Sequence, residues 1–144
     1  MSYFNEESKL SIKEAIERAE KQTSGEICVF LDKRCKTDPF EKALEHFHKL
    51  KMTETKLRNG ALIYIATEDK VFAILGDQGI HEKVGQEFWD QSKAIMKEHF
   101  MMGEVTTGIV KAIDQIGEAL KMYFPYEEGD VNELANDVIT GDDD

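Results

Sequence analysis

Acidic side chains gather in short segments of this chain, each next to a predicted strand. Asp32 and Asp38 enclose the residues after one apolar run, and Asp69 lies in a tight turn after another. A third apolar run is followed by a further polar group: Asp77, Gln78 and Glu82. Calcium takes about six to eight oxygen ligands from carboxylates, carbonyls and water. These residues therefore predict a site for one or two calcium ions, although no Asp-x-Asp-x-Asp-Gly loop of an EF-hand is present.

The same residues also suit a simpler interpretation, in which they are solvated turn residues. Asp38 precedes Pro39, so its carboxylate can accept the first free N–H groups of a helix, and Pro39 stands where its missing donor costs nothing. The residue pattern alone leaves both interpretations open.

Two further patterns point to other chemistry and are weaker. Cys28 and Arg34 have the Cys-x5-Arg spacing of cysteine phosphatases. Cys28 is followed by Val29-Phe30-Leu31, which cannot form an anion-binding loop, so we expect a core cysteine. His46 and His48 are two apart on a predicted helix and point to different sides, so we expect no zinc. We interpret Cys28 and Cys35 as free thiols.

A hairpin is the clearest element that could position these side chains. The apolar runs Ala61–Ala66 and Val71–Leu75 flank a polar turn at Glu68 and Asp69. The first run is apolar on both faces, which is typical of a strand inside a sheet that is covered on both sides.

Helices and one more strand are predicted around the hairpin. A capping box at Ser11 and Glu14 predicts a first helix, and a strand follows over Glu26–Leu31. The helix after Asp38 should bury Phe40, Ala43, Leu44 and Phe47. A short and then a longer helix follow Gly79, with core filling expected from Met96, Met101 and Met102. A last amphipathic helix, stopped by Pro125, should bury Ile109, Ala112, Ile113, Ile116, Leu120 and Tyr123.

This order of elements predicts an α/β fold, a three-layer α/β/α sandwich. Its small mixed sheet combines a parallel crossover with an antiparallel hairpin and is flanked by helices. Residues 1–125 form one domain, and we expect the acidic segment 126–144 to be a mobile tail. In this fold one end of the sheet carries Asp32, Asp38, Glu68 and Asp69, and the other carries Glu26, Asn59, Asp77 and Glu82.

Charge and hydropathy exclude several classes of partner. The net charge of −11 over 144 residues disfavours nucleic acid and anionic membrane surfaces. We find no apolar run that could span a bilayer and no signal peptide at the start of the chain, so we expect no membrane insertion and a cytoplasmic protein. The expected partners are a divalent cation and another protein.

Several short motifs resemble those of the TPM domain family. They are the strand start Asn59-Gly60-Ala61-Leu62-Ile63, the turn Glu68-Asp69-Lys70, the exit Gly76…Gly79-Ile80, and a later Phe-x-x-Gly-x-x-x-x-Gly segment from Phe100 to Gly108. The resemblance covers roughly residues 8 to 125. It implies an αβα fold and calcium binding near the sheet-edge loops, with a regulatory or interaction role.

The resemblance also implies an alternative function, because some members are described as acid phosphatases that act in photosystem repair. A bound cation would then assist phosphomonoester hydrolysis, with Asp69 as general base. This chain departs from the family pattern at two positions. Gly79-Ile80-His81 stands where relatives have Gly-Leu-Glu, and Lys70 replaces an arginine that could hold phosphate by two hydrogen bonds.

Overall fold

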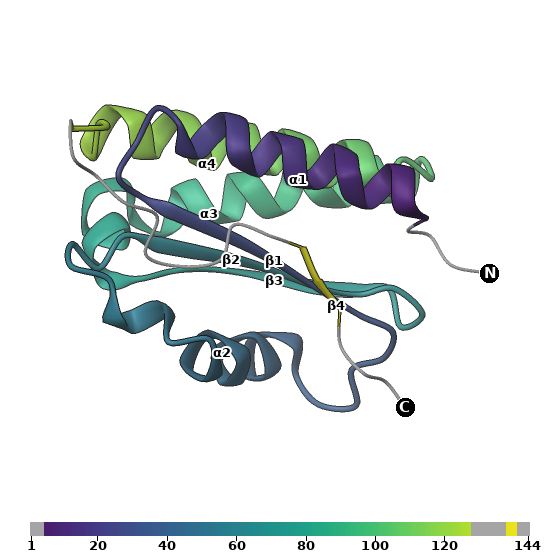
Figure 1. Ribbon diagram of the computed structural model, residues 1–144. Helices are drawn as coiled ribbons and strands as arrows, with labels where there is room; N and C mark the ends of the chain where they lie inside the picture. Colours follow the sequence, from purple (N-terminus) through teal and green to yellow (C-terminus); the bar gives the residue numbers. More distant parts are fainter. Residues whose placement is uncertain (1–4, 128–137, 141–144) are drawn as a thin grey trace.

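Three layers of secondary structure follow each other in the computed structural model, which describes residues 5–127 and 138–140 (Figure 1). The elements are α1 (Glu6–Glu20), β1 (Glu26–Asp32), α2 (Pro39–Lys49), a short 3-10 turn (Met52–Glu54), β2 (Gly60–Ala66), β3 (Val71–Gly76), α3 (Gln78–Met101), α4 (Val105–Tyr123) and β4 (Val138–Thr140). Helices α1, α3 and α4 cover one face of the sheet, and α2 covers the other (Figure 1). The predicted three-layer α/β fold is confirmed.

The sheet has the strand order β3-β2-β1-β4. β1 and β2 are parallel, with Glu26 opposite Gly60 and Asp32 opposite Ala66. β2 and β3 form the predicted antiparallel hairpin, with Ala61 opposite Gly76. This register places the acidic residues at the two ends of the sheet that the sequence predicted.

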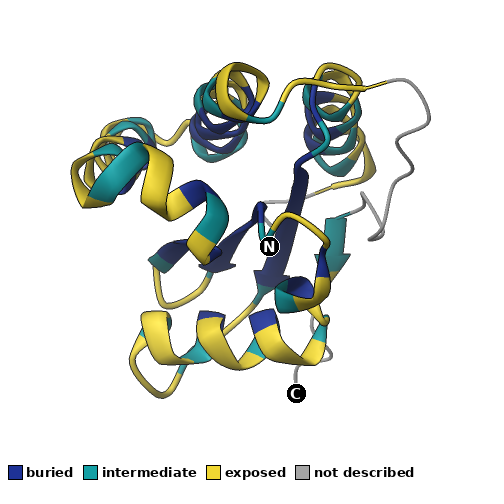
Figure 2. Ribbon diagram, turned by 90° about the vertical axis from the view of Figure 1, so that its left-hand side faces the viewer, coloured by how far each residue is buried: buried dark blue, intermediate teal, exposed yellow. Residues whose placement is uncertain are grey.

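A separate apolar core fills each space between the layers. The larger core joins alternate residues of β1 and β2, such as Val29 and Ile63, to α1, α3 and α4. The smaller core joins the other faces of these strands to Ala43 and Phe47 of α2. Every residue of β2 is buried, as expected for a strand that is covered on both sides (Figure 2).

The helix starts follow local capping, with one correction. The Asp38 carboxylate accepts a hydrogen bond from the Glu41 N–H at 3.1 Å, so the predicted cap of α2 is confirmed. α1 begins earlier than predicted, because Asn5 caps it by accepting from the Ser8 N–H at 2.8 Å. The Ser11-Glu14 capping box was therefore wrong, since both residues lie inside an established helix. Gly85, with a φ of 79°, divides α3 into the short and long segments that were predicted.

Five side chains expected in the core are exposed instead. α2 rests on the sheet along a narrow stripe, so only two of its four predicted core residues are buried. The other three residues lie at the C-terminal ends of α3 and α4. The exposed residues are Phe40, Leu44, Met101, Met102 and Tyr123.

The C-terminal segment contains a strand that was not predicted. Val138–Thr140 pair in parallel with Val29–Leu31 and form β4 at the edge of the sheet. At these residues the expectation of a mobile tail was wrong, because they form a strand. A strand of three residues is too short a pattern to be recognised in the sequence. The rest of the predicted tail, apart from Tyr126 and Glu127, lies outside the described residues. No helix in the described ranges is long and apolar enough to cross a membrane.

Candidate functional site

The two ends of the sheet carry polar side chains of different kinds. We call the first the loop end; it comprises residues 32–38 after β1 and residues 66–70 around the hairpin turn. We call the second the Arg58 end; it comprises residues 55–60 before β2 and residues 76–79 between β3 and α3. The carboxyl ends of the parallel strands β1 and β2 meet at the loop end. This is the edge at which open α/β sheets bind ligands.

Backbone hydrogen bonds fasten the hairpin turn to the loop after β1. The Thr67 N–H donates to the Asp32 carbonyl at 2.9 Å, and the Glu68 N–H donates to the Lys33 carbonyl at 2.8 Å. Lys70 closes the turn with a φ of 56°, in the left-handed region. The two segments therefore form one continuous rim beyond the sheet.

A chain of side-chain contacts links Asp32 to Asp69 along this rim. The buried Tyr64 hydroxyl donates to Asp32 Oδ2 at 2.9 Å. The Cys35 side chain lies next to this hydroxyl and helps to raise the pKa of Tyr64, while its thiol donates to the Thr37 carbonyl at 3.1 Å. The Cys35 N–H donates to Asp69 Oδ2 at 2.6 Å. The structure thus connects Asp32 and Asp69, which are far apart in sequence, through Tyr64 and Cys35.

Burial controls the protonation of the aromatic groups beneath the rim. It raises the pKa of the Tyr64 hydroxyl far above its usual value, and the hydrogen bond to Asp32 raises it further. Tyr64 therefore stays protonated and acts as a donor. His46 stacks on Phe30 at a ring distance of 3.8 Å, and burial lowers its pKa, assisted by the charge of Lys42. His46 Nε2 is buried and has no hydrogen-bond partner among the described residues.

Asp77 organises the Arg58 end. Only 6% of Asp77 is exposed, and its carboxylate receives two hydrogen bonds from Arg58, at 2.6 and 2.8 Å. It also accepts from the Gln78 N–H at 2.8 Å and so caps α3. The hydrogen bond to Asp77 raises the pKa of Arg58. Because one guanidinium and one helix N-terminus already neutralise this carboxylate, Asp77 holds the fold together.

The remaining predicted ligands are not gathered in one place. Asp38 caps α2, whereas Gln78 and Glu82 are exposed in the first turns of α3. Glu68 pairs with Arg34 at 3.1 Å on the surface of the loop end. In the part of the chain that the structure describes, no group of three or more His, Cys, Asp or Glu side chains is positioned to hold a metal ion. Of the six predicted ligands, Asp77 accepts a hydrogen bond from its neighbour Gln78, and Asp32 and Asp69 lie on one rim although they come from separate segments.

Three residues contact the predicted site residues at these ends but were not predicted from the sequence to do so. Arg58 pairs with Asp77, and Tyr64 and Cys35 join Asp32 to Asp69. A tyrosine in an otherwise aliphatic buried strand was the one available signal, since a buried hydroxyl needs a polar partner. The pairing of Arg58 with Asp77 left no signal, because it depends on the approach of α3 to the segment before β2.

The cysteines and histidines behave as the sequence predicted. Cys28 is buried in the middle of β1, and Arg34 lies on the surface, so the two do not form a phosphatase loop. Both cysteines are free thiols. His46 faces the sheet and His48 is exposed, so the two imidazoles lie on different sides of α2.

Comparisons with known proteins agree with this architecture. A family model described as TPM domain matches residues 1–119. The solved structure of the BA42 protein from the psychrophilic bacterium Bizionia argentinensis is similar, with 44% identity, a TM-score of 0.89 and 97% of each chain covered. The N-terminal domain of the cg2496 protein from Corynebacterium glutamicum shares the fold, with 10% identity, a TM-score of 0.65 and coverage of 96% of this chain and 82% of that one. No curated protein matches.

Proposed function

Because this chain belongs to the TPM domain family, we propose that it binds a divalent cation, calcium above all, at the loop end of its sheet. The observation that carries the proposal is the link from Asp32 through Tyr64 and Cys35 to Asp69. It brings two carboxylates from separate segments to one rim at the carboxyl ends of parallel strands, where ligands of α/β sheets bind.

The donors at this rim suit calcium in their chemistry. Carboxylate and carbonyl oxygens of exposed loops are hard ligands of the kind that calcium prefers. Two carboxylates do not make a closed cage, so water must complete the coordination shell. We therefore expect weak binding, with a Kd of about 10⁻⁴ to 10⁻³ M, as in the weakest protein sites for calcium.

Ion binding at this rim would regulate how the loop end contacts another protein. Asp32 ends β1 and Asp69 lies in the hairpin turn, so an ion held by both would tie the two segments together. Arg34 and Glu68 are exposed on the same rim, and their ion pair would respond to the added charge. The surface that another protein meets at the loop end would then depend on calcium. We propose a regulatory or interaction role for the domain on this basis.

Hydrolysis of phosphomonoesters stays a prediction from the family resemblance. In the structure, one oxygen of Asp69 is held by the Cys35 N–H, as expected of a residue that positions a loop. Assaying a generic phosphomonoester with the variants described next would test this alternative. Turnover that is lost with both a chelator and Asp69→Asn would support it.

Calorimetric titration of the metal-stripped protein with calcium tests the proposal. We expect heat of binding in the millimolar range, and a gain in unfolding free energy of about 1.4 kcal/mol at roughly ten times Kd. Asp32→Asn and Asp69→Asn should weaken binding strongly. Glu82→Gln is the matched control, because it removes one exposed carboxylate near the Arg58 end. Absence of heat and of a stability gain, or equal weakening by Glu82→Gln, would refute the proposal.

A further inference from the structure

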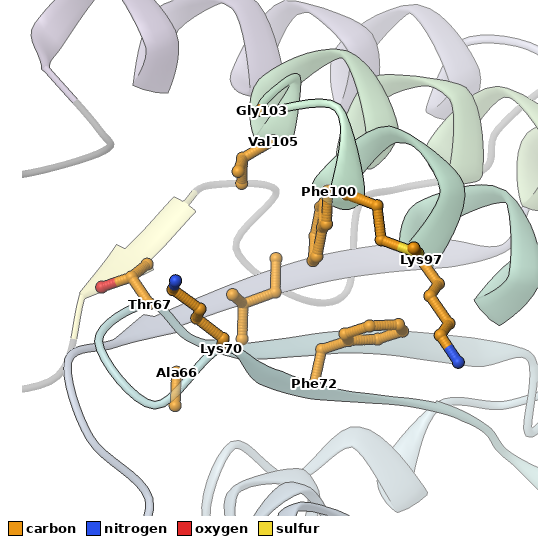
Figure 3. Close-up of a pocket in the computed structure, with 10 residues that line it drawn as sticks. Ala66, Thr67, Lys70, Phe72, Lys97, Phe100, Gly103 and Val105 are labelled. Atoms are coloured by element: carbon orange, nitrogen blue, oxygen red, sulfur yellow. The ribbon is translucent and has the colours of Figure 1, made fainter.

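An open pocket of about 560 Å³ lies between the hairpin and the corner at which α3 passes into α4 (Figure 3). This volume is in the range of about 300 to 1,000 Å³ that is typical of small-molecule sites. Residues of two strands, the hairpin turn and both helices line it, among them Thr67, Lys70, Phe72, Lys97, Phe100 and Val105. Three residues of the loop end, Ala66, Thr67 and Lys70, belong to its lining, so the pocket adjoins the segment that carries Asp69.

The walls of the pocket are mainly apolar. Phe72 and Phe100 meet edge to face, with their ring centres 5.1 Å apart, and Val105 lies across from them (Figure 3). Met101 borders the opening and is 78% exposed. An unbranched methionine side chain adapts to ligands of different shape. A flexible apolar chain would therefore find contacts on several sides.

A glycine in the left-handed region turns the chain between α3 and α4 beside the pocket. Gly103 adopts a φ of 77°, and a Cβ at this position would meet no other atom within 4 Å. Glycine thus serves the left-handed backbone of the α3–α4 turn, and no side chain enters the pocket from it.

Two lysine side chains lie at the rim of this apolar pocket. Lys70 and Lys97 lie on opposite sides of Phe72 and Phe100 (Figure 3). Within the described ranges, neither lysine forms an ion pair. Two lysines without acidic partners are notable in a chain with a net charge of −11. They place two positively charged groups at the opening.

We propose that this pocket binds an amphipathic monoanion, a carboxylate with an unbranched apolar chain. The ammonium group of Lys70 would hold the carboxylate at the rim of the pocket. The apolar chain would lie against Phe72, Phe100 and Val105. Cationic ligands are disfavoured because the two lysines repel them. Purely polar ligands are disfavoured because they form no apolar contacts with the aromatic walls.

Titration of the full chain with octanoate, followed by amide resonances, tests the proposal. We expect shifts confined to the lining residues and to their neighbours in the α3–α4 turn. Acetate lacks the apolar chain and octylammonium has the opposite charge, so both should bind at least several times more weakly. Equal affinity for octylammonium, or shifts spread over the whole surface, would overturn the proposal.

Matched variants locate the anion. Lys70→Met keeps the length of the stem and removes the charge, and it should weaken octanoate binding about fivefold, as expected for a partly exposed ion pair. Lys93→Met changes an exposed lysine of α3 outside the pocket and should leave affinity unchanged. Val105→Phe should reduce binding by filling the pocket. Octanoate affinity that is the same in Lys70→Met and Val105→Phe as in the parent would contradict the assignment.

Discussion

The carboxylate of Asp77 at the Arg58 end is buried, receives two hydrogen bonds from a guanidinium and caps a helix. At the loop end, the exposed carboxylate of Asp69 accepts a backbone N–H from the neighbouring loop. An acidic residue that is already neutralised serves the fold, whereas an exposed one on a rim is available to a ligand. Counting acidic residues near strand ends therefore overstates the number of ion sites.

The largest expected effect of a single substitution is at the Arg58 end. In Gly79→Ala, the new Cβ would stand 2.2 Å from the Leu57 carbonyl oxygen, where backbone has to move. We expect a loss of about 3 kcal/mol of unfolding free energy, in the range of overpacking. Urea denaturation measures it. Gln78→Ala, an exposed neighbour, should stay within about 0.5 kcal/mol of the parent. Similar losses in both variants would show that the end is not closely packed.

Asp77→Ala and Asp69→Ala compare the two ends directly. Asp77→Ala removes a helix cap, which costs about 1 kcal/mol, and the loss of the Arg58 pair adds to this cost. Asp69→Ala should cost less, at most about 1 kcal/mol, because it removes one hydrogen bond, from the Cys35 N–H, at an exposed site. Denaturation curves for both variants check the contrast. Equal destabilisation by the two substitutions would remove the distinction between the ends.

Some features of the two ends could be predicted from the sequence, and others could not. The Asp38-Pro39 helix start, the hairpin from Ala61 to Leu75 and the placement of acidic residues at two ends could be predicted, because each depends on local chemistry or on strand direction. The pairing of Arg58 with Asp77 could not, since it depends on where α3 meets the sheet. The pocket depends in the same way on where the corner between α3 and α4 lies. The exposure of Phe40 depends on how narrow a stripe of α2 rests on the sheet.

Tyr64→Phe sharpens the account of the loop end. The substitution leaves the ring buried and removes the hydroxyl that donates to Asp32 at 2.9 Å. We expect a loss of roughly 1 kcal/mol of unfolding free energy, the net value of one hydrogen bond. Calcium affinity should also fall, because the link between Asp32 and Asp69 is broken. An unchanged calorimetric titration would show that Tyr64 does not position the rim.

His46 gives the smallest expected effect, and it depends on pH. Burial holds the pKa of His46 below its usual value of 6.5, so the unfolded chain binds a proton more readily than the folded one. This contribution to stability is complete above pH 6.5 and declines as the pH falls below that value toward the lowered pKa in the folded state. His46→Phe should reduce this decline, because phenylalanine has no group to protonate. Denaturation at several pH values checks it; identical pH profiles would contradict it.

A calcium titration monitored by amide resonances tests the central distinction most directly, because it reports on both ends of the sheet in one experiment. We predict that resonances of residues 32–38 and 66–70 shift as calcium is added, while those of residues 55–60 and 76–79 stay in place. Shifts at the Arg58 end without shifts at the loop end would contradict the account.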